Sequence, residues 1–321
     1  MSRAVPTCRE IEPELVAVGA GEGLPAAVEA VEQHVASCPE CREELQKYRA
    51  LDRLVGDLRE DTASTADPAL ARAELESRLA DLRRRLITFG VFSSPVGPVL
   101  IGRTEEGVSV VEYLSSPSAA ASRLARLEGV DTVEDEGQTQ GLHRDLLDYL
   151  EGRRTQLEWP LDLRLAKSDF QRRVLQVTAA LPYGAVTSYA HIAREIGAPT
   201  ASRAVAQALR RNPLPIVVPC HRVVGSSGDL VGYAGNKVGL KQRLLTLEGV
   251  PVKGEGDLHI ERPAMYVRYH AESEYCLPTC GALPTTPLAE LTLFGSRARA
   301  ESVGLTPCSS CRPDLHPLAA A

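Results

Sequence analysis

A single cysteine lies between a proline and a histidine in the segment PIVVPCHRVVG, residues 215–225. The prolines exclude a helix, and the three β-branched residues at 216–218 are typical of a short buried strand ending at the rim of a core. Apolar surroundings ordinarily raise the pKa of a buried cysteine and leave it inert. Here His221 follows directly and can accept the thiol proton, while Glu248 can orient the imidazole through its other nitrogen. The pattern predicts that Cys220 is an activated nucleophile.

The chain has eight cysteines among 321 residues, and the other seven fall into two groups near its ends. With 44% hydrophobic and 24% charged residues, the composition is that of a soluble globular protein of about two domains. No apolar run reaches the roughly 18 residues of a membrane span, and the first ten residues lack the order of a signal peptide. We therefore expect a cytoplasmic protein whose reduced cysteines serve catalysis or metal binding.

The first cysteine group has the spacing C-x25-H-x3-C-x2-C, through Cys8, His34, Cys38 and Cys41. His34 and Cys38 are one helical turn apart and share a helix face, and a tight turn brings the Cys38 and Cys41 thiolates to one ion. Four such ligands suit zinc. The site either only holds short helices together or belongs to a partner-binding or redox-sensing module, since a closed four-ligand site has no open position for chemistry.

The second group has the spacing C-x3-C-x27-C-x2-C, through Cys276, Cys280, Cys308 and Cys311. Four thiolates at this spacing predict a second zinc ion. Its role stays open between a structural or sensory zinc knot and a chemically reactive site.

The elements around Cys220 have the pattern of a DNA-binding lobe. A helix capped by Ser168 or Asp169 is followed by a break at PYGAV, a second helix from Ser188 to a stop at Gly197, and a third helix, PTASRAVAQALRRN. Two short helices across a glycine-containing turn predict a helix-turn-helix. The third helix carries small residues, such as Ala204, that permit close approach to a DNA groove. It also carries the cations Arg203, Arg210 and Arg211.

The charge is uneven along the chain. The net charge of −6 does not favour a nucleic-acid partner, but residues 162–250 carry 12 Lys and Arg against 5 Asp and Glu, so the middle of the chain is basic. Residues 87–165 alternate strand-like segments with turns and end in a helical pattern, which predicts a small antiparallel sheet and a helix. Residues 61–86 begin polar and become helical, as expected of a linker helix.

Residues 87–250 resemble the O6-alkylguanine-DNA alkyltransferase family, also called methylated-DNA-protein-cysteine methyltransferases. The resemblance is carried by PYGAVTSYAHIA, SRAVAQALRRNPLPIVVPCHRVVG, GYAG and LLTLEG. It implies a direct and irreversible transfer of an alkyl group from guanine O6 to Cys220, with no cofactor for the reaction. An O6-alkylated base pairs poorly, so it is extruded from the duplex at less cost than a normal base.

The resemblance also implies roles for individual residues. Asn212 holds the turn that contains Cys220, Tyr189 donates a hydrogen bond to the base or pushes on the target phosphate, and Arg203 enters the stack where the flipped base had been. Tyr233 and Ser226 line the base pocket. The predicted DNA-binding set is Arg203, Ala204, Arg210, Arg211 and Arg222.

The chain departs from the family pattern in the segment GYAGN. Asn236 stands where a second glycine is usual, and Ala234 offers no hydroxyl to the pocket. These two departures are expected to alter the range of alkyl groups accepted.

The two ends of the chain carry resemblances of their own. Roughly the first 60 residues resemble the zinc-binding anti-sigma factor family. The segment with the last four cysteines resembles the metal-binding module of the bacterial adaptive-response protein Ada, which implies Cys276 as an acceptor of methyl groups from phosphotriesters. Basic residues of that module are missing here, which weakens phosphate binding; their positions hold Leu277, Gly281, Ala282, Ser309 and Ser310.

Together these patterns predict an α+β fold, an alkyltransferase with a small antiparallel-sheet N-terminal lobe and a helix-turn-helix C-terminal lobe, flanked by two small zinc modules. The predicted domains are an anti-sigma-like zinc-binding helical module at 1–60, a linker helix at 61–86, the N-terminal α/β lobe at 87–165, the catalytic DNA-binding lobe at 166–252 and an Ada-like zinc module with four cysteine ligands at 253–321.

The predicted function is DNA repair by a single-turnover methylated-DNA-protein-cysteine S-methyltransferase. The expected partners are double-stranded DNA containing O6-alkylguanine and, through residues 1–60, a sigma factor or another protein, with no membrane. The alternative is a zinc-dependent regulator, an anti-sigma factor or alkylation sensor that binds DNA or a sigma factor. Stable binding of residues 1–60 to a sigma factor would distinguish the two.

Overall fold

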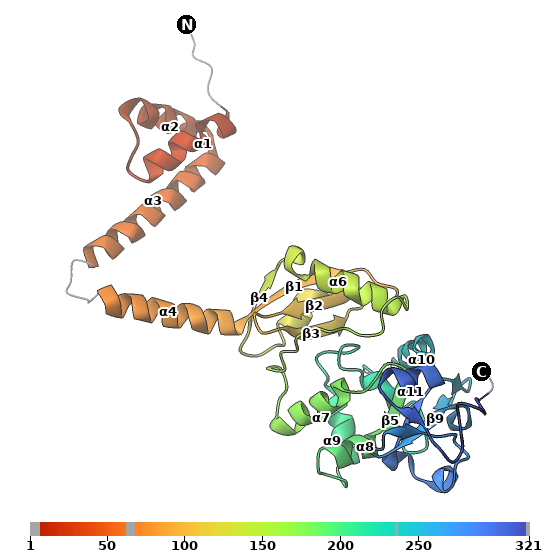
Figure 1. Ribbon diagram of the computed structural model, residues 1–321. Helices are drawn as coiled ribbons and strands as arrows, with labels where there is room; N and C mark the ends of the chain where they lie inside the picture. The colour runs from red at the N-terminus through yellow and green to blue at the C-terminus, as the bar shows by residue number, and fades with distance from the viewer. Residues whose placement is uncertain (1–6, 62–67, 235–236, 319–321) are drawn as a thin grey trace. The chain divides into compact units, whose positions relative to one another are not determined.

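The computed structural model describes residues 7–61, 68–234 and 237–318, and the chain divides into two compact units, residues 1–79 and 80–321 (Figure 1). In the first unit, three helices pack on one another: α1 (Cys8–Gly19), α2 (Pro25–Ser37) and α3 (Pro39–Asp61). Their shared core includes Ile11, Leu15, Val31 and Leu45. The helix α4 (Pro68–Arg85) follows, in place of the linker helix expected at 61–86.

The second unit opens with a four-stranded sheet made of β1 (Leu86–Phe92), β2 (Val99–Arg103), β3 (Val108–Tyr113) and β4 (Asp131–Glu134), in the order β3-β2-β1-β4. The pairs β1–β2 and β2–β3 are antiparallel as predicted, but β4 runs parallel to β1. The helix α6 (Glu136–Leu150) packs on β1 and β2 (Figure 1), and the short α5 (Ala120–Leu124) precedes β4.

The predicted helices around the turn are present. They are α7 (Asp169–Ala179), α8 (Tyr189–Glu195) and α9 (Ser202–Arg210). A further helix, α10 (Val238–Leu247), follows Cys220 and is not among the predicted elements. Ser168 and Ser188 cap α7 and α8 by accepting hydrogen bonds from backbone amides, which confirms both predicted caps. Gly197 lies just after the end of α8 and has a φ of 74°, a conformation that favours glycine. The pair α8–α9 is therefore the helix-turn-helix.

A second four-stranded sheet joins the end of the chain to the helix-turn-helix lobe. Its order is β6-β5-β11-β9, with β5 (Ala185–Ser188) between β6 (Val223–Val224) and β11 (Leu291–Phe294), and β9 (Tyr266–Tyr269) at the edge. Because β5 pairs with β11, residues on both sides of position 252 share one sheet and one apolar core. The segment 253–321 is therefore built onto the lobe before it rather than packed as a separate unit.

The remaining elements are short. They are β7 (Val252–Lys253), β8 (His259–Ile260), β10 (Glu274–Tyr275), β12 (Thr306–Pro307), α11 (Arg297–Ser302), and the 3-10 helices η1 (Pro117–Ala119), η3 (Arg262–Ala264), η4 (Leu283–Thr285) and η5 (Leu288–Glu290). Across the described parts of the chain, we find no helix with both the length and the apolar character of a membrane span.

Candidate active site and metal clusters

Cys220 is held by a tight turn, not by a strand. The strand expected at 216–218 is absent: Ile216 has a φ of 74°, and the chain folds back so that Pro215 and Val218 form an isolated bridge. The Asn212 amide closes this turn by donating to Val218 O at 2.9 Å, while its oxygen accepts from the Leu214 amide at 2.9 Å. Prolines at both ends of a three-residue apolar run leave no length for a strand ladder.

The sulfur of Cys220 lies in a largely dry environment. The residue is 8% exposed at the start of the 3-10 helix η2 (Cys220–Arg222), and Asn212 Nδ2 donates a hydrogen bond to its Sγ at 3.2 Å. Burial raises the pKa of the Cys220 thiol above its usual value, although the Asn212 hydrogen bond and the Lys241 ammonium oppose this. At neutral pH the resting cysteine is therefore a thiol that needs a base.

The neighbouring His221 is the candidate for this base. His221 Nε2 lies 2.6 Å from Glu248 Oε1, as expected from the sequence. The N–H at this nitrogen donates a hydrogen bond to the carboxylate. Burial lowers the pKa of His221 although Glu248 opposes the shift, so the ring is neutral at pH 7. Its other nitrogen, Nδ1, is buried and has no partner among the described residues, which leaves it as a free acceptor.

Arg222 is misassigned to the DNA-binding set, because its side chain is only 6% exposed and faces inward. Its Nε donates to Glu248 Oε2 at 2.8 Å, and its terminal nitrogens reach Glu248 Oε1 and Tyr149 Oη at 3.1 Å each. Burial opposes ionisation of Glu248, but the hydrogen bond from His221 and the charge of the Arg222 guanidinium hold the pKa of this carboxyl well below its usual range. Arg222 thus keeps Glu248 ionised beneath His221.

The Glu248 carboxylate is fully satisfied. Besides the histidine and arginine contacts, Oε1 accepts from the Tyr149 hydroxyl and Oε2 accepts from the Gly184 amide at 3.0 Å. Gly184 has a φ of 72°, and a Cβ there would lie 2.8 Å from Glu248 O, so both conformation and space require glycine. The glycine of PYGAV therefore belongs to the active-site support.

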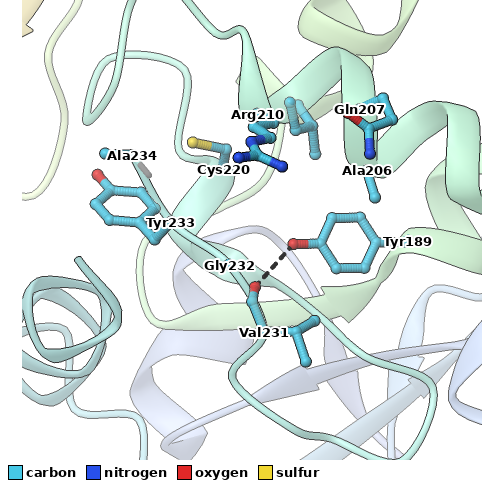
Figure 2. Close-up of a pocket in the computed structure, with 10 residues that line it drawn as sticks. Tyr189, Ala206, Gln207, Arg210, Cys220, Val231, Gly232, Tyr233 and Ala234 are labelled. Carbon is cyan, nitrogen blue, oxygen red and sulfur yellow. Dashed lines mark hydrogen bonds between the residues drawn. The ribbon is translucent and has the colours of Figure 1, made fainter. Parts of the chain in front are cut away.

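A cavity of about 280 Å³ opens beside Cys220, and Figure 2 shows the side chains around it. Tyr189 at the start of α8 lines one wall and donates from its hydroxyl to Val231 O at 3.2 Å. Tyr233 lines another and shares a 2.9 Å hydrogen bond between its hydroxyl and that of Tyr113. The lining residues are Tyr189, Ala206, Gln207, Leu209, Arg210, Cys220, Val231, Gly232, Tyr233 and Ala234.

One predicted pocket residue is placed elsewhere. Ser226 lies exposed in the turn after β6 and is not among the residues that line this cavity, so the structure does not support its assignment to the base pocket. The turn residues Gly225 to Gly228 are closed on themselves by a backbone hydrogen bond, which carries Ser226 outward. Ala234 does line the cavity, whereas Asn236 lies outside the described residues.

Sequence reasoning missed a buried lysine that interacts electrostatically with Cys220. The Lys241 ammonium is inaccessible to solvent and donates to Val223 O at 2.6 Å and Val231 O at 3.3 Å. Burial lowers the pKa of Lys241 to about 8, and a negative charge on Cys220 opposes this shift. A sequence signal was present, because Lys241 stands three and four residues before Leu244 and Leu245, on the apolar face of its helix.

The second helix of the helix-turn-helix presents its cations to solvent. In α9, Val205, Ala208 and Leu209 are buried, whereas Arg203 and Ala204 at its start are exposed. Arg210 and Arg211 are exposed at its end. Within the described parts of the chain, none of these three arginines forms a salt bridge, so their charges are available to phosphates.

Comparison with known proteins decides the family. A family model described as the DNA-binding domain of 6-O-methylguanine DNA methyltransferase matches residues 169–250. The methylated-DNA–protein-cysteine methyltransferase of Methanosarcina acetivorans is 38% identical over 164 residues, 50% of this chain and 97% of that protein. The chain belongs to the methylated-DNA–protein-cysteine methyltransferase family. This confirms the resemblance of residues 87–250.

Other members of the family agree. The methylated-DNA–protein-cysteine methyltransferase of Mycobacterium tuberculosis is 37% identical over 166 residues, 51% of this chain and 93% of that protein. A crystal structure of the O6-methylguanine methyltransferase from that organism has 37% identity and a TM-score of 0.44, covering 50% of this chain and 92% of that one. These methyltransferase matches span about half of the present chain.

The first cysteine group of this methyltransferase-family chain comes together as the spacing predicts. The ligand atoms of Cys8, His34, Cys38 and Cys41 all lie within 4.8 Å of one another, with the Cys8 and Cys38 sulfurs 3.8 Å apart. His34 is 5% exposed, and both of its ring nitrogens are buried without a hydrogen-bond partner in the described chain. A buried imidazole without partners beside three thiols fits a metal ion.

The second group also converges. The sulfurs of Cys276, Cys280, Cys308 and Cys311 lie within 4.8 Å of one another, and the Leu277 amide donates to Cys311 Sγ at 3.3 Å. Four sulfurs with a backbone amide directed at one of them fit a metal-bound thiolate set. The cluster belongs to the apolar core shared with β5 and β11, so it anchors the end of the chain to the catalytic lobe.

Proposed function

We propose that this protein repairs O6-alkylguanine in double-stranded DNA by transferring the alkyl group to Cys220, once per molecule. The arrangement that supports this best is the buried series Cys220, His221 and Glu248 at the wall of a cavity that α9 borders. A thiol, an adjacent histidine and a carboxylate that holds the histidine are the groups that an activated cysteine nucleophile requires. The reaction requires a reduced thiol, which suits a cytoplasmic location.

In the proposed reaction, His221 Nδ1 accepts the Cys220 proton, directly or through water, while Glu248 stabilises the imidazolium that forms. The sulfur attacks the alkyl carbon and forms an S–C bond as the C–O6 bond breaks, and that electron pair stays with the guanine. The guanine then takes up a proton and becomes an ordinary base. Nothing regenerates the thiol, because the sulfur of a thioether is a poor leaving group. Each molecule therefore reacts once.

The other residues around the cavity position the base. Asn212 fixes the turn that presents Cys220, and Tyr233 forms a wall of the base pocket. Tyr189 contacts the target base or its phosphate. Its hydroxyl, which donates to Val231 O in the free chain, then donates to an acceptor on the nucleic acid. Arg203 fills the space that the flipped base leaves, which offsets part of an unstacking cost of a few kcal/mol.

Stoichiometry tests this proposal. Protein is mixed with excess duplex DNA carrying O6-methylguanine, and the restored guanine is counted. We expect one guanine per protein molecule, after which the reaction stops. Continued turnover would mean that the sulfur is not the final acceptor, and the absence of any restored guanine would mean that the chain does not carry out this repair.

The role of Arg203 predicts a substrate-dependent defect. Arg203→Ala is expected to slow single-turnover transfer from duplex DNA by about tenfold or more, because an unfilled stack re-closes on the base. Transfer from free O6-alkylguanine base should be nearly unchanged, since that substrate has no stack. Single-turnover rates on both substrates measure the difference.

The matched controls are Arg210→Ala and Arg211→Ala at the other end of α9. Because these arginines are expected to bind phosphates, each substitution should lower DNA affinity and reduce the salt slope by roughly one unit. An equal loss on duplex and free base for Arg203→Ala would show that Arg203 supports the fold or the nucleophile, and the flipping role would be withdrawn.

We further propose that both clusters hold zinc, with Cys8, His34, Cys38 and Cys41 as one ligand set and the four C-terminal cysteines as the other. Both sets are complete with four protein ligands, so the metal supplies structure rather than an open coordination position. Elemental analysis of freshly purified, reduced protein should give two zinc ions per chain. Protein that is fully folded yet contains no zinc would contradict both assignments.

Cys276 is proposed as a ligand and not as a second methyl acceptor. It is 9% exposed and forms a backbone bridge with Val267 of β9, whereas Cys280 and Cys311 are more accessible. The nearby Arg312 and Arg297 are paired with Asp314 and Glu301, so their charges are compensated. A methyl group found on Cys276 after incubation with methyl-phosphotriester DNA would overturn this.

The N-terminal unit supports a second, separate proposal. On α3, Leu51, Leu54 and Val55 are 58%, 60% and 36% exposed at the spacing of a single helix face. We propose this face as the contact for a helical protein partner, with a sigma factor as the first candidate from the anti-sigma resemblance. Binding of purified sigma factor to the full chain, abolished in Leu54→Ser and kept in Arg53→Ser, tests it; no measurable binding would remove that partner.

A further inference from the structure

A second cavity reaches Cys220 from another side. It has a volume of about 570 Å³ and lies between β3 and the turn that holds Cys220. Both this cavity and the smaller one beside Tyr189 are lined by Leu209, Arg210, Cys220, Tyr233 and Ala234. The reactive sulfur therefore stands at the junction of two spaces, of which the flipped base needs one.

The second cavity is strongly cationic. Lys167, Arg210, Arg211 and Lys237 line it, and none of the four has a carboxylate partner among the described residues. The acidic lining residue, Glu112, is paired with Arg123, which also lines the cavity. The net charge of the lining is thus positive, and it is not compensated from within the described chain.

One of these cations is held at the junction. Lys237 Nζ lies 5.1 Å from the centre of the Tyr113 ring, and the Tyr113 hydroxyl is bonded to that of Tyr233 at 2.9 Å. The backbone amide of Lys237 also donates to Tyr233 O at 2.9 Å. A cation over an aromatic face is favourably placed. The ammonium is therefore positioned close to the wall that both cavities share.

We propose that the second cavity receives the substituent of the alkyl carbon and favours O6 substituents that carry a negative charge, such as a carboxymethyl group. The inference rests on the proposed transfer to Cys220 and names the substrate class of the same site. When the base occupies the cavity beside Tyr189, the carbon attached to O6 faces the sulfur. A group extending from that carbon then has the second cavity as its space, and a carboxylate there meets the Lys237 ammonium.

The transfer is the same displacement as for a methyl group. The sulfur forms a bond to the CH2 carbon of the carboxymethyl group, the C–O6 bond breaks, and its electron pair stays on the guanine, which takes up the thiol proton. The products are S-carboxymethylcysteine and guanine. No oxidant, reductant or further reactant is needed.

The test compares two free bases of almost equal size, O6-carboxymethylguanine and its neutral amide O6-carbamoylmethylguanine. Free bases have no phosphates, so differences in DNA binding do not enter the comparison. Single-turnover rates of the full chain are followed by intact-mass spectrometry. We expect the carboxylate to react faster than the amide, by up to about fivefold for each cation that it meets. Lys237→Gln should lower this rate ratio, and Lys237→Arg should retain it.

Lys253→Gln is the matched control, because Lys253 pairs with Glu261 and does not line the cavity. It should leave the ratio unchanged. A ratio near one in the unmodified chain, or a ratio that Lys237→Gln and Lys253→Gln affect alike, would overturn the inference. Reaction with O6-methylguanine DNA in the same preparations separates this outcome from failure of the proposed function, which would abolish transfer from every substrate.

Discussion

Cys220→Ser is expected to abolish alkyl transfer while leaving binding to duplex DNA largely intact. A serine hydroxyl has a far higher pKa than a thiol, and His221 cannot deprotonate it at neutral pH. Cys220 is also the cysteine that belongs to neither four-ligand cluster, so the substitution removes no predicted metal ligand. The DNA-contacting face of α9 stays in place. Loss of O6-methylguanine and binding of labelled duplex measure the two properties separately.

Thermal unfolding of the serine variant provides the control for folding, and the variant should unfold near the temperature of the unmodified protein. If Cys220→Ser still removed methyl groups from guanine O6, the assignment of the acceptor would be wrong. If it lost transfer and DNA binding together while remaining folded, Cys220 would be part of the DNA contact and not only the acceptor.

Glu248→Gln is expected to have the largest effect on stability. Glu248 is 1% exposed and accepts hydrogen bonds from His221, Arg222, Tyr149 and Gly184, so its loss of charge leaves the Arg222 guanidinium buried without a counterion. Breaking a buried ion pair by removing one partner costs about 3–5 kcal/mol. Transfer should also slow, because the imidazolium that forms on His221 loses its carboxylate. Chemical denaturation and single-turnover rates give the two effects.

Glu106→Gln is the matched control for this substitution. Glu106 is 69% exposed and lies 3.5 Å from Arg164, so the same chemical change at the surface should cost no more than about 1 kcal/mol. Equal destabilisation by the two variants would show that the Glu248 network does not hold the site together.

The pH dependence of this network follows from the direction of the Glu248 shift. Its pKa is lowered in the folded chain, so the stability it provides is present above the ordinary pKa of a glutamate and is lost as the pH falls toward the lowered folded value. The Glu248 contribution is therefore complete at neutral pH, and it disappears only in strong acid.

Much of the catalytic lobe could be predicted because its signals are local. The caps Ser168 and Ser188, the stop at Gly197 and the breaks at proline depend on a few neighbouring residues, and the structure confirms them. The two cysteine clusters were predictable for the same reason, because ligand spacing reflects the geometry that one ion requires. The contact of His221 with Glu248 followed from residue chemistry and the family resemblance.

The features that sequence reasoning missed are one local turn and several contacts between distant segments. The apolar run at 216–218 has strand composition, but the Asn212 amide and the flanking prolines impose a turn. Arginine is a residue type that often contacts DNA, but Glu248 and Tyr149 approach Arg222 from distant segments and bury it. The pairing of β5 with β11 joins residues about 100 positions apart, which no local pattern indicates.

The most direct test of the central claim is intact-mass spectrometry of the full chain after incubation with duplex DNA containing O6-methylguanine, followed by peptide mapping. The account predicts that each protein molecule gains the mass of one methyl group in place of a hydrogen, and that the group lies on the peptide containing Cys220. An unchanged mass while guanine is restored, or a methyl group on any other residue, would contradict it.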